Sequence, residues 1–125
     1  MEELTYKIRG CIFEVFKELR PGLLETVYEA ALVYGLKQSG LNVESQIAIP
    51  VFYKNIRFEL GFRMDILVED EVIIEIKSIE CIHDVHKKQL LTYLKLIGRK
   101  IGILVNFNSA HLINKESLIR IVNNY

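Results

Sequence analysis

Two acidic residues and a lysine interrupt an otherwise apolar stretch in the middle of the chain. The stretch FRMDILVEDEVIIEIKSIE predicts two strands joined by an acidic turn, with Asp65 in the first strand and Glu75 and Lys77 in the second. A loop at residues 69–71 places Asp65 opposite Glu75, with Cβ atoms roughly 5 Å apart. Because two buried carboxylates at this distance repel each other, the spacing suggests a divalent cation, and oxygen ligands suit Mg²⁺ or Mn²⁺.

The same three charges could instead form a salt-bridged strand pair with solvated ends, because this short pattern is common. The second strand, residues 72–76, is otherwise apolar on both faces. Such a pattern is typical of a central strand that is covered on both sides. Charged side chains there are more often functional than structural, so the pattern favours the metal site and leaves the ion pair open.

Composition limits the class of protein. The chain has 125 residues, half of them hydrophobic, which indicates one domain with its own core and argues against disorder. Sixteen Lys and Arg balance sixteen Asp and Glu, so no overall charge attracts the chain to nucleic acid or membrane. Residues 85–115 nevertheless contain no Asp or Glu and six basic residues: Lys87, Lys88, Lys95, Arg99, Lys100 and Lys115. That segment could face phosphates while the carboxylates hold metal.

The cysteines and the apolar runs indicate where in the cell the protein is located. Cys11 and Cys81 have neither CxxC nor Cys/His ligand spacing, and two lone cysteines fit a reducing cytoplasm. The first ten residues lack the apolar core of a signal peptide. No apolar run approaches the roughly 20 residues of a spanning helix. We therefore expect a cytoplasmic protein with no membrane partner.

The elements that must position the charged residues follow from hydrophobic periodicity. It predicts helices over 5–19, 24–39 and 84–97, and strands over 43–50, 51–53, 56–60, 62–68, 72–77 and 101–107. The segment 117–122 fits a short helix or an edge strand equally well. A crossover through the third helix should make strands 72–77 and 101–107 parallel neighbours. We expect an α/β fold, a mixed sheet flanked by helices in a single domain over residues 1–125.

Spacing also assigns individual helical residues. The predicted buried sides are Leu24, Val27, Tyr28, Ala31, Leu32 and Leu36 in the second helix, and Leu90, Leu91, Leu94 and Ile97 in the third. Asp84 is the expected cap of the third helix and Gly98 its stop. Glu25 shares a face with Tyr28, and the simplest roles are a helix-dipole charge and a core aromatic. Gln89 and Tyr93 lie four residues apart.

At this point the chain resembles a known family. Residues 22–28, GLLETVY, match the signature that names the GxxExxY protein family, and the resemblance continues through PVFYKNIRFELGFRMDILVEDEVIIEIKSIE and HKKQLLTYLKLIGRKIGILVNFN. It therefore covers nearly the whole chain. That family resembles a compact branch of the PD-(D/E)xK nuclease superfamily, which implies a restriction-endonuclease-like fold. One departure is Met64, which stands where the superfamily motif has proline.

The resemblance implies roles for particular residues. Asp65 matches the acid of the first core motif, and Glu75 with Lys77 matches ExK. Gln89 and Tyr93 match the QxxxY helix motif of the exonuclease-like branch, although surface hydrogen bonding and core packing stay open for them. Glu25 matches the helical acid that precedes the core strands. The segment HDVH, residues 83–86, has metal-like spacing, but oxygen-rich Mg²⁺ sites rarely need imidazole.

We therefore expect a metal-dependent nuclease that hydrolyses phosphodiester bonds in nucleic acid, with DNA favoured. Mg²⁺ or Mn²⁺ would be held by Asp65, Glu75, the main-chain carbonyl of Ile76, and Glu25. The residues expected to hold the nucleic-acid backbone are Lys87, Lys88, Lys95, Arg99 and Lys100.

Two alternatives remain. One is a non-catalytic module that binds nucleic acid or protein and keeps the fold. The other is a purely structural, metal-free fold. The chain shows no added domain to grip DNA, so a partner protein or a homodimer could supply that grip.

Overall fold

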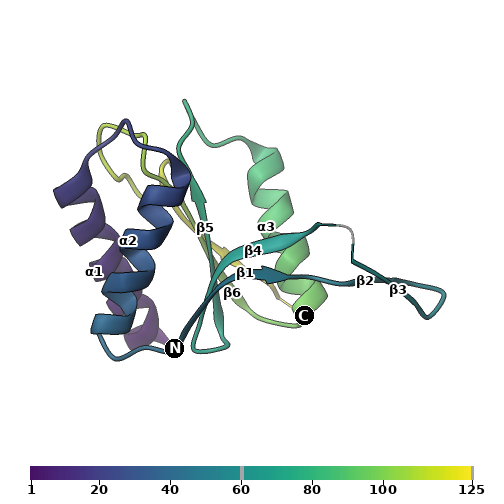
Figure 1. Ribbon diagram of the computed structural model, residues 1–125. Helices are drawn as coiled ribbons and strands as arrows, with labels where there is room; N and C mark the ends of the chain where they lie inside the picture. Colours follow the sequence, from purple (N-terminus) through teal and green to yellow (C-terminus); the bar gives the residue numbers. More distant parts are fainter. Residues whose placement is uncertain (60, 125) are drawn as a thin grey trace.

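In the computed structural model, which describes residues 1–59 and 61–124, helices cover both faces of a five-stranded sheet (Figure 1). The elements are α1 (Glu2–Leu19), α2 (Glu25–Gln38), β1 (Val43–Ala48), β2 (Val51–Tyr53), β3 (Ile56–Phe58), β4 (Arg63–Val68), β5 (Val72–Lys77), α3 (Asp84–Ile97), β6 (Ile101–Asn106) and β7 (Leu118–Val122). The helices α1 and α2 lie on one side of the sheet, and α3 lies on the other.

The order of strands in the sheet is β1-β4-β5-β6-β7, so the strand that carries Glu75 is central. β5 and β6 are parallel neighbours joined through α3, as the crossover predicted. β4 and β5 form an antiparallel hairpin in which Val68 pairs with Val72, which is the predicted register. The last segment, left open between helix and strand, forms the edge strand β7. The predicted fold class is confirmed.

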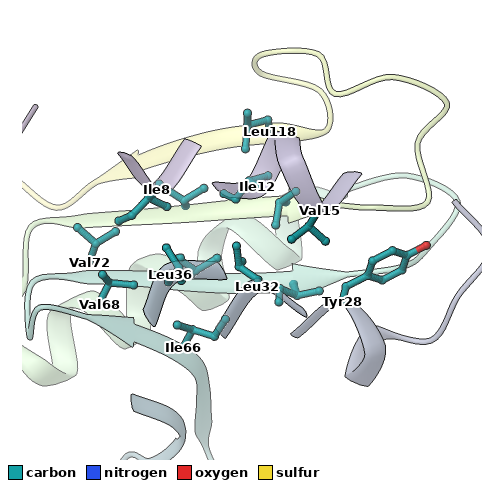
Figure 2. Packing of buried hydrophobic residues seen from close by; sticks show 14 of the residues in the cluster. Ile8, Ile12, Val15, Tyr28, Leu32, Leu36, Ile66, Val68, Val72 and Leu118 are labelled. Atoms are coloured by element: carbon teal, nitrogen blue, oxygen red, sulfur yellow. The ribbon is translucent and has the colours of Figure 1, made fainter. Parts of the chain in front are cut away.

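The larger core layer lies between the first two helices and the sheet (Figure 2). Its buried side chains include Ile8, Ile12, Val15, Leu32 and Leu36 from the helices and Ile66, Val68, Val72 and Leu118 from the strands. Apolar residues three and four apart supply the helical stripe, and alternate residues supply the strand face. This layer therefore holds α1 and α2 against the hairpin of β4 and β5.

Tyr28 ties this layer to the turn between α1 and α2. Its ring stacks on Phe107, with centroids 4.6 Å apart and planes 8° apart. Its hydroxyl donates to the carbonyl of Arg20 at 2.6 Å and accepts from the main-chain N–H of Leu23 at 3.1 Å. Gly22, with φ of +113°, supplies the left-handed residue of the turn. The buried ring thereby fixes where α2 begins.

The second core layer lies between α3 and the opposite face of the sheet. Leu90, Tyr93 and Leu94 of α3 belong to the same buried cluster as Ile73 of β5 and Leu104 of β6. All residues of β5 from 72 to 76 are buried. The prediction of a central strand covered on both sides is therefore confirmed.

The predicted start of the first helix and part of the predicted stripe of the second are wrong. α1 begins at Glu2 rather than near Thr5, and an acidic first turn suits the positive end of the helix dipole. Leu24 and Val27 are exposed rather than buried. Leu24 precedes the helix in extended backbone, and burial in α2 follows the four-residue spacing from Tyr28 onward.

Two details of the third helix also differ from prediction. The capping residue is His83, and Asp84 lies in the first turn, with its carboxylate 3.7 Å from the Nζ of Lys87. Leu91 and Ile97 are half-buried rather than buried. Tyr93 takes a place in the buried stripe instead, because α3 is rotated to face it toward the sheet. The helix ends at Gly98 in the left-handed conformation, as predicted.

β2 and β3 form a separate two-stranded sheet that projects from the body of the protein (Figure 1). Lys54 and Asn55 occupy the turn with φ of 50° and 66°. Two successive left-handed residues match the right-handed twist of a tight hairpin. The predicted hairpin is thus confirmed; Leu60, predicted to end its second arm, lies outside the described residues.

Substitution of Gly102 in β6 tests the close contact between α3 and the sheet. A Cβ there would lie 2.9 Å from Leu90 Cγ and from both of its methyl groups. We expect Gly102→Ala to lower the free energy of unfolding by about 1–3 kcal/mol, as measured by urea denaturation. Gly35→Ala is the control, because that helical position has open space around it and should gain rather than lose stability.

The contact between Gly102 and Leu90 also predicts that the effects of substitutions at these two residues are not additive. In a Leu90→Ala background, Gly102→Ala should cost little, because the obstructing side chain is gone. An equal cost in both backgrounds would contradict the proposed contact.

Candidate active site

Asp65 and Glu75 meet where the backbone pairing of β4 and β5 stops. The last paired residues before them are Ile66 and Ile74. The main-chain N–H of Asp65 donates to Glu75 Oε2 at 2.7 Å, and the main-chain N–H of Ile76 donates to Asp65 Oδ2 at 2.8 Å. Each carboxylate therefore bonds the main chain of the opposite strand, and the two acids meet between the strands rather than on opposite sides of the sheet.

Burial makes both carboxylates hard to ionise. Glu75 is only 5% exposed. Its burial, followed by the negative charge of Asp65, raises the pKa of Glu75 to about 8. Burial also raises the pKa of Asp65, more than the hydrogen bond from Ile76 and the charge of Lys77 lower it. Ionisation of both acids at this site is therefore unfavourable, and a bound cation would offset that cost.

Glu25 lies at the start of α2 and contacts the end of β5. Its Oε2 accepts from the main-chain N–H of Ser78 at 3.1 Å. The hydroxyl of Ser78 donates to the carbonyl of Leu23 at 2.8 Å. Ser78 directly follows the half-buried Lys77. The turn anchored by the Tyr28 ring is thus attached to the strand that carries the ExK residues, and the charge of Glu25 is felt by Asp65.

Glu29 and Gln46 belong to this neighbourhood although the sequence interpretation missed them. Gln46 Nε2 donates to Glu29 Oε1 at 2.7 Å, and a side-chain hydrogen bond from Gln46 also lowers the pKa of Asp65. Burial raises the pKa of Glu29, with smaller contributions from the charges of Asp65 and Glu25. The available signal for Glu29 was its spacing of four from Glu25, which places both on one face of the helix.

Asn106 is a further residue that positions the site. It is buried next to Lys77 on β6, accepts from the main-chain N–H of Ile79 at 3.1 Å and donates to the carbonyl of Ile79 at 3.0 Å. It therefore holds the loop that follows β5. A lone amide in the apolar run ILVNF was the signal for it.

The two residues of the QxxxY pattern are placed differently. Tyr93 is buried, its ring meets Phe62 edge-on at 6.2 Å, and burial followed by the charges of Glu75 and Asp65 raises its pKa. Gln89 is exposed, and its side chain makes no hydrogen bond within the described part of the chain. The fold thus places Tyr93 beside the acid pair, and the role expected of Gln89 stays a prediction.

His86 lies beside the same site, from the first turn of α3. Its Nδ1 accepts from the main-chain N–H of His83 at 2.9 Å. Burial lowers the pKa of His86, and the positive charge of Lys77 lowers it further. The neutral ring therefore carries its proton on Nε2.

The basic residues predicted to bind nucleic acid fall into two groups. Lys87 and Lys88 lie at the start of α3, whereas Lys95, Arg99 and Lys100 lie at its other end. Arg99 contacts the Asp70 carboxylate at 3.0 Å and its carbonyl at 2.7 Å, at the far end of the β4–β5 hairpin. A strand such as β5 spans roughly 16 Å. The first group lies next to His86, at the end of α3 that follows β5, whereas Arg99 is occupied by a structural contact.

The predicted metal ligands do not form a ready-made metal cluster among the described residues. Across residues 1–59 and 61–124, no three His, Cys, Asp or Glu side chains are close enough to hold one metal ion. Asp65 and Glu75 each direct one oxygen at a main-chain N–H, and Glu25 faces Ser78. The donors are nevertheless all hard oxygens of the kind that Mg²⁺ and Mn²⁺ prefer. The chemistry of the set fits a divalent cation, with rotation of the carboxylates needed to gather it.

Comparison with protein families agrees with the fold. The chain matches the model of the PD-(D/E)XK nuclease superfamily over residues 2–121, and it belongs to that superfamily. Its mixed five-stranded sheet flanked by helices is consistent with the restriction-endonuclease-like fold. Membership implies a nucleic-acid substrate and a nuclease-like function. No curated protein matches the chain. None of the described helices is long and apolar enough to cross a membrane.

The raised pKa of Glu75 predicts how stability depends on pH. Because its folded pKa of about 8 exceeds its ordinary value of 4.5, the folded protein holds an extra proton between these values. Stability should therefore fall as pH rises through this window, by up to about 1.4 kcal/mol per pH unit. Urea denaturation in EDTA from about pH 5 to about pH 9, which covers most of this window and extends past its alkaline end, measures the slope.

Glu75→Gln should flatten that dependence and exceed the wild type in stability at the alkaline end. Glu71→Gln is the matched control, since Glu71 is exposed at the far end of the same hairpin and should follow the wild type. Identical slopes for wild type and Glu75→Gln would show that the buried acid does not titrate as described.

Proposed function

We propose that this chain is a divalent-metal-dependent nuclease that hydrolyses phosphodiester bonds, with DNA as the favoured substrate and Mg²⁺ or Mn²⁺ as the cofactor. Residues 1–125 would form one nuclease domain of the GxxExxY branch. The observation that carries the proposal is the acid pair of half-buried Asp65 and buried Glu75 at the opening of a central hairpin, with Lys77 one residue beyond Ile76. Two free thiols, Cys11 and Cys81, suit a reducing cytoplasm.

The GxxExxY signature has a physical role that supports this branch. Gly22 allows the left-handed turn, and Tyr28 holds that turn with its hydroxyl. Glu25, between them, reaches the residue after Lys77. The three signature positions therefore act together to bring an acid on a helix to the end of the strand bearing Glu75.

The proposed ligands are Asp65, Glu75, the Ile76 carbonyl and Glu25. When bound, the cation supplies charge neutralisation at phosphate oxygens and lowers the pKa of a water. Asp65 and Glu75 would leave their main-chain partners to turn toward it, and its charge would offset the cost of ionising both acids.

Neighbouring residues would orient the reacting groups. Lys77, on the same face as Glu75, would orient the attacking water and stabilise charge that develops on the phosphate. Tyr93, and Gln89 by rotation of its exposed side chain, would position a phosphate oxygen or the Lys77 amine. Lys87 and Lys88 would contact the backbone near the site.

Substitution of the acid and the amine tests catalysis. We expect Asp65→Ala and Lys77→Ala each to lower Mg²⁺-dependent cleavage by about 100-fold or more while thermal unfolding remains cooperative. The measurement is cleavage of labelled single- and double-stranded DNA and RNA with Mg²⁺ or Mn²⁺. Lys37→Ala, at an exposed position on α2, is the control and should cleave as the wild type does. Equal trace activity in wild type and variants would indicate a contaminating nuclease.

Metal binding can be tested without any substrate. Mn²⁺ should raise the melting temperature of the wild type by at least about 3 °C near saturation. Glu75→Ala should show no such rise, whereas Glu71→Ala should retain it. No rise in the wild type would argue against a metal site and favour the structural, metal-free fold.

A non-catalytic binding module is the second candidate. It is favoured by the engagement of Asp65, Glu75 and Glu25 with main-chain N–H groups, because no metal-ligating cluster results among the described residues. Binding of nucleic acid by the wild type without cleavage under any metal would support this candidate over the nuclease.

A further inference from the structure

The β2–β3 hairpin carries apolar side chains that the protein does not bury. Its exposed apolar residues are Phe52, Tyr53, Ile56 and Phe58, and Phe62 follows where the chain returns to β4. Figure 1 shows the hairpin extending beyond the helices and the main sheet. An isolated two-stranded hairpin is marginally stable in water, and concentrated exposed apolar surface marks a binding site. The hairpin therefore has the features of an arm that contacts a partner.

The register distributes these side chains over both faces of the arm. Tyr53 pairs with Ile56, whereas Phe52 pairs with Arg57. Neighbouring residues along a strand point to opposite faces, so Tyr53 and Phe52 present rings in opposite directions. They are 63% and 61% exposed. Because aromatic rings project from both of its faces, the hairpin is poorly suited to packing one face against a protein core.

The charge of the arm is positive. Residues 50–63 hold Lys54, Arg57 and Arg63 and a single acid, Glu59. Arg57 and Glu59 pair at 2.8 Å. Lys54 has no acidic partner among the described residues, and its Nζ lies 5.4 Å from the ring centroid of Tyr53. An ammonium beside an exposed ring complements a chain of phosphates and bases, because the base stacks while the phosphate is neutralised.

The arm is continuous with the candidate active site. The chain leaves the arm through Phe62 and Arg63, and Arg63 is two positions before Asp65. Phe62 meets Tyr93 edge-on beside the acid pair, and Arg63 donates to the carbonyl of Gln46 on β1. A nucleic-acid strand bound at Asp65 and Glu75 can therefore continue onto the arm.

We propose that the β2–β3 hairpin binds single-stranded nucleic acid by stacking unpaired bases on Tyr53 and Phe52, with Lys54 at the phosphates. This inference rests on the proposed function and names its substrate class. Bases inside a duplex are already stacked on each other, so the arm discriminates in favour of single strands.

Fluorescence anisotropy of short labelled DNA of mixed sequence tests the arm, with the full chain in EDTA to prevent cleavage. Tyr53→Ala should weaken single-strand binding by about tenfold and leave duplex binding unchanged. Tyr53→Phe should bind as the wild type, and Tyr53→Leu should be as weak as Tyr53→Ala, because leucine keeps apolar bulk without a ring. Tyr34→Ala, a 68% exposed tyrosine on α2, is the matched control and should have no effect.

Other outcomes overturn the inference. Unchanged single-strand affinity in Tyr53→Ala, or full affinity in Tyr53→Leu, rules out stacking. If the wild type sediments as a dimer that Tyr53→Ala dissociates while DNA affinity stays the same, the hairpin covers a second copy of the chain instead.

The two proposals fail separately. Cleavage by the wild type together with no effect of Tyr53→Ala on binding rejects the arm and keeps the nuclease. Tyr53-dependent binding together with no cleavage under any metal rejects the nuclease and keeps the arm as a binding element.

Discussion

The structure depends on one exchange of hydrogen bonds between two strands. Asp65 and Glu75 accept the main-chain N–H groups of Ile76 and Asp65, in place of the carbonyls that would continue the ladder of β4 and β5. This satisfies buried donors, but it confines two acids in a site where burial opposes their ionisation. A central strand can hold such a pair only because the rest of β5 is apolar and covered on both faces.

The two core layers have different consequences for this pair. The layer beneath α1 and α2 fixes the turn before Glu25 through the ring and hydroxyl of Tyr28, so hydrophobic packing determines where a helical acid meets the end of β5. The layer beneath α3 places Tyr93 on the opposite face of the sheet. The acid pair is thus held by elements whose own stability comes from apolar burial rather than from charge.

β1 contributes a local distortion of the backbone at Gln46 rather than a metal ligand. Gln46 has a φ of 52° and lies between the paired positions that align β1 with β4. Its amide bonds Glu29, so the neighbourhood holds four acids and needs neutral donors between them. The same edge of the sheet leads outward into the β2–β3 hairpin, which joins the exposed aromatic arm directly to the strand of Asp65.

The sequence by itself determined every strand except β7, the register of the β4–β5 hairpin, the central place of β5 and the opposition of Asp65 to Glu75. These follow from alternation, loop length and the crossover rule, which are local or topological. Only the tertiary structure decided which other side chains gather around the pair. Glu29 and Gln46 join it through the left-handed backbone of Gln46 in β1 and the docking of α2, while Arg99 turns to Asp70. Gln89 stays exposed, because the rotation of a helix about its axis is set by long-range packing and not by its own spacing.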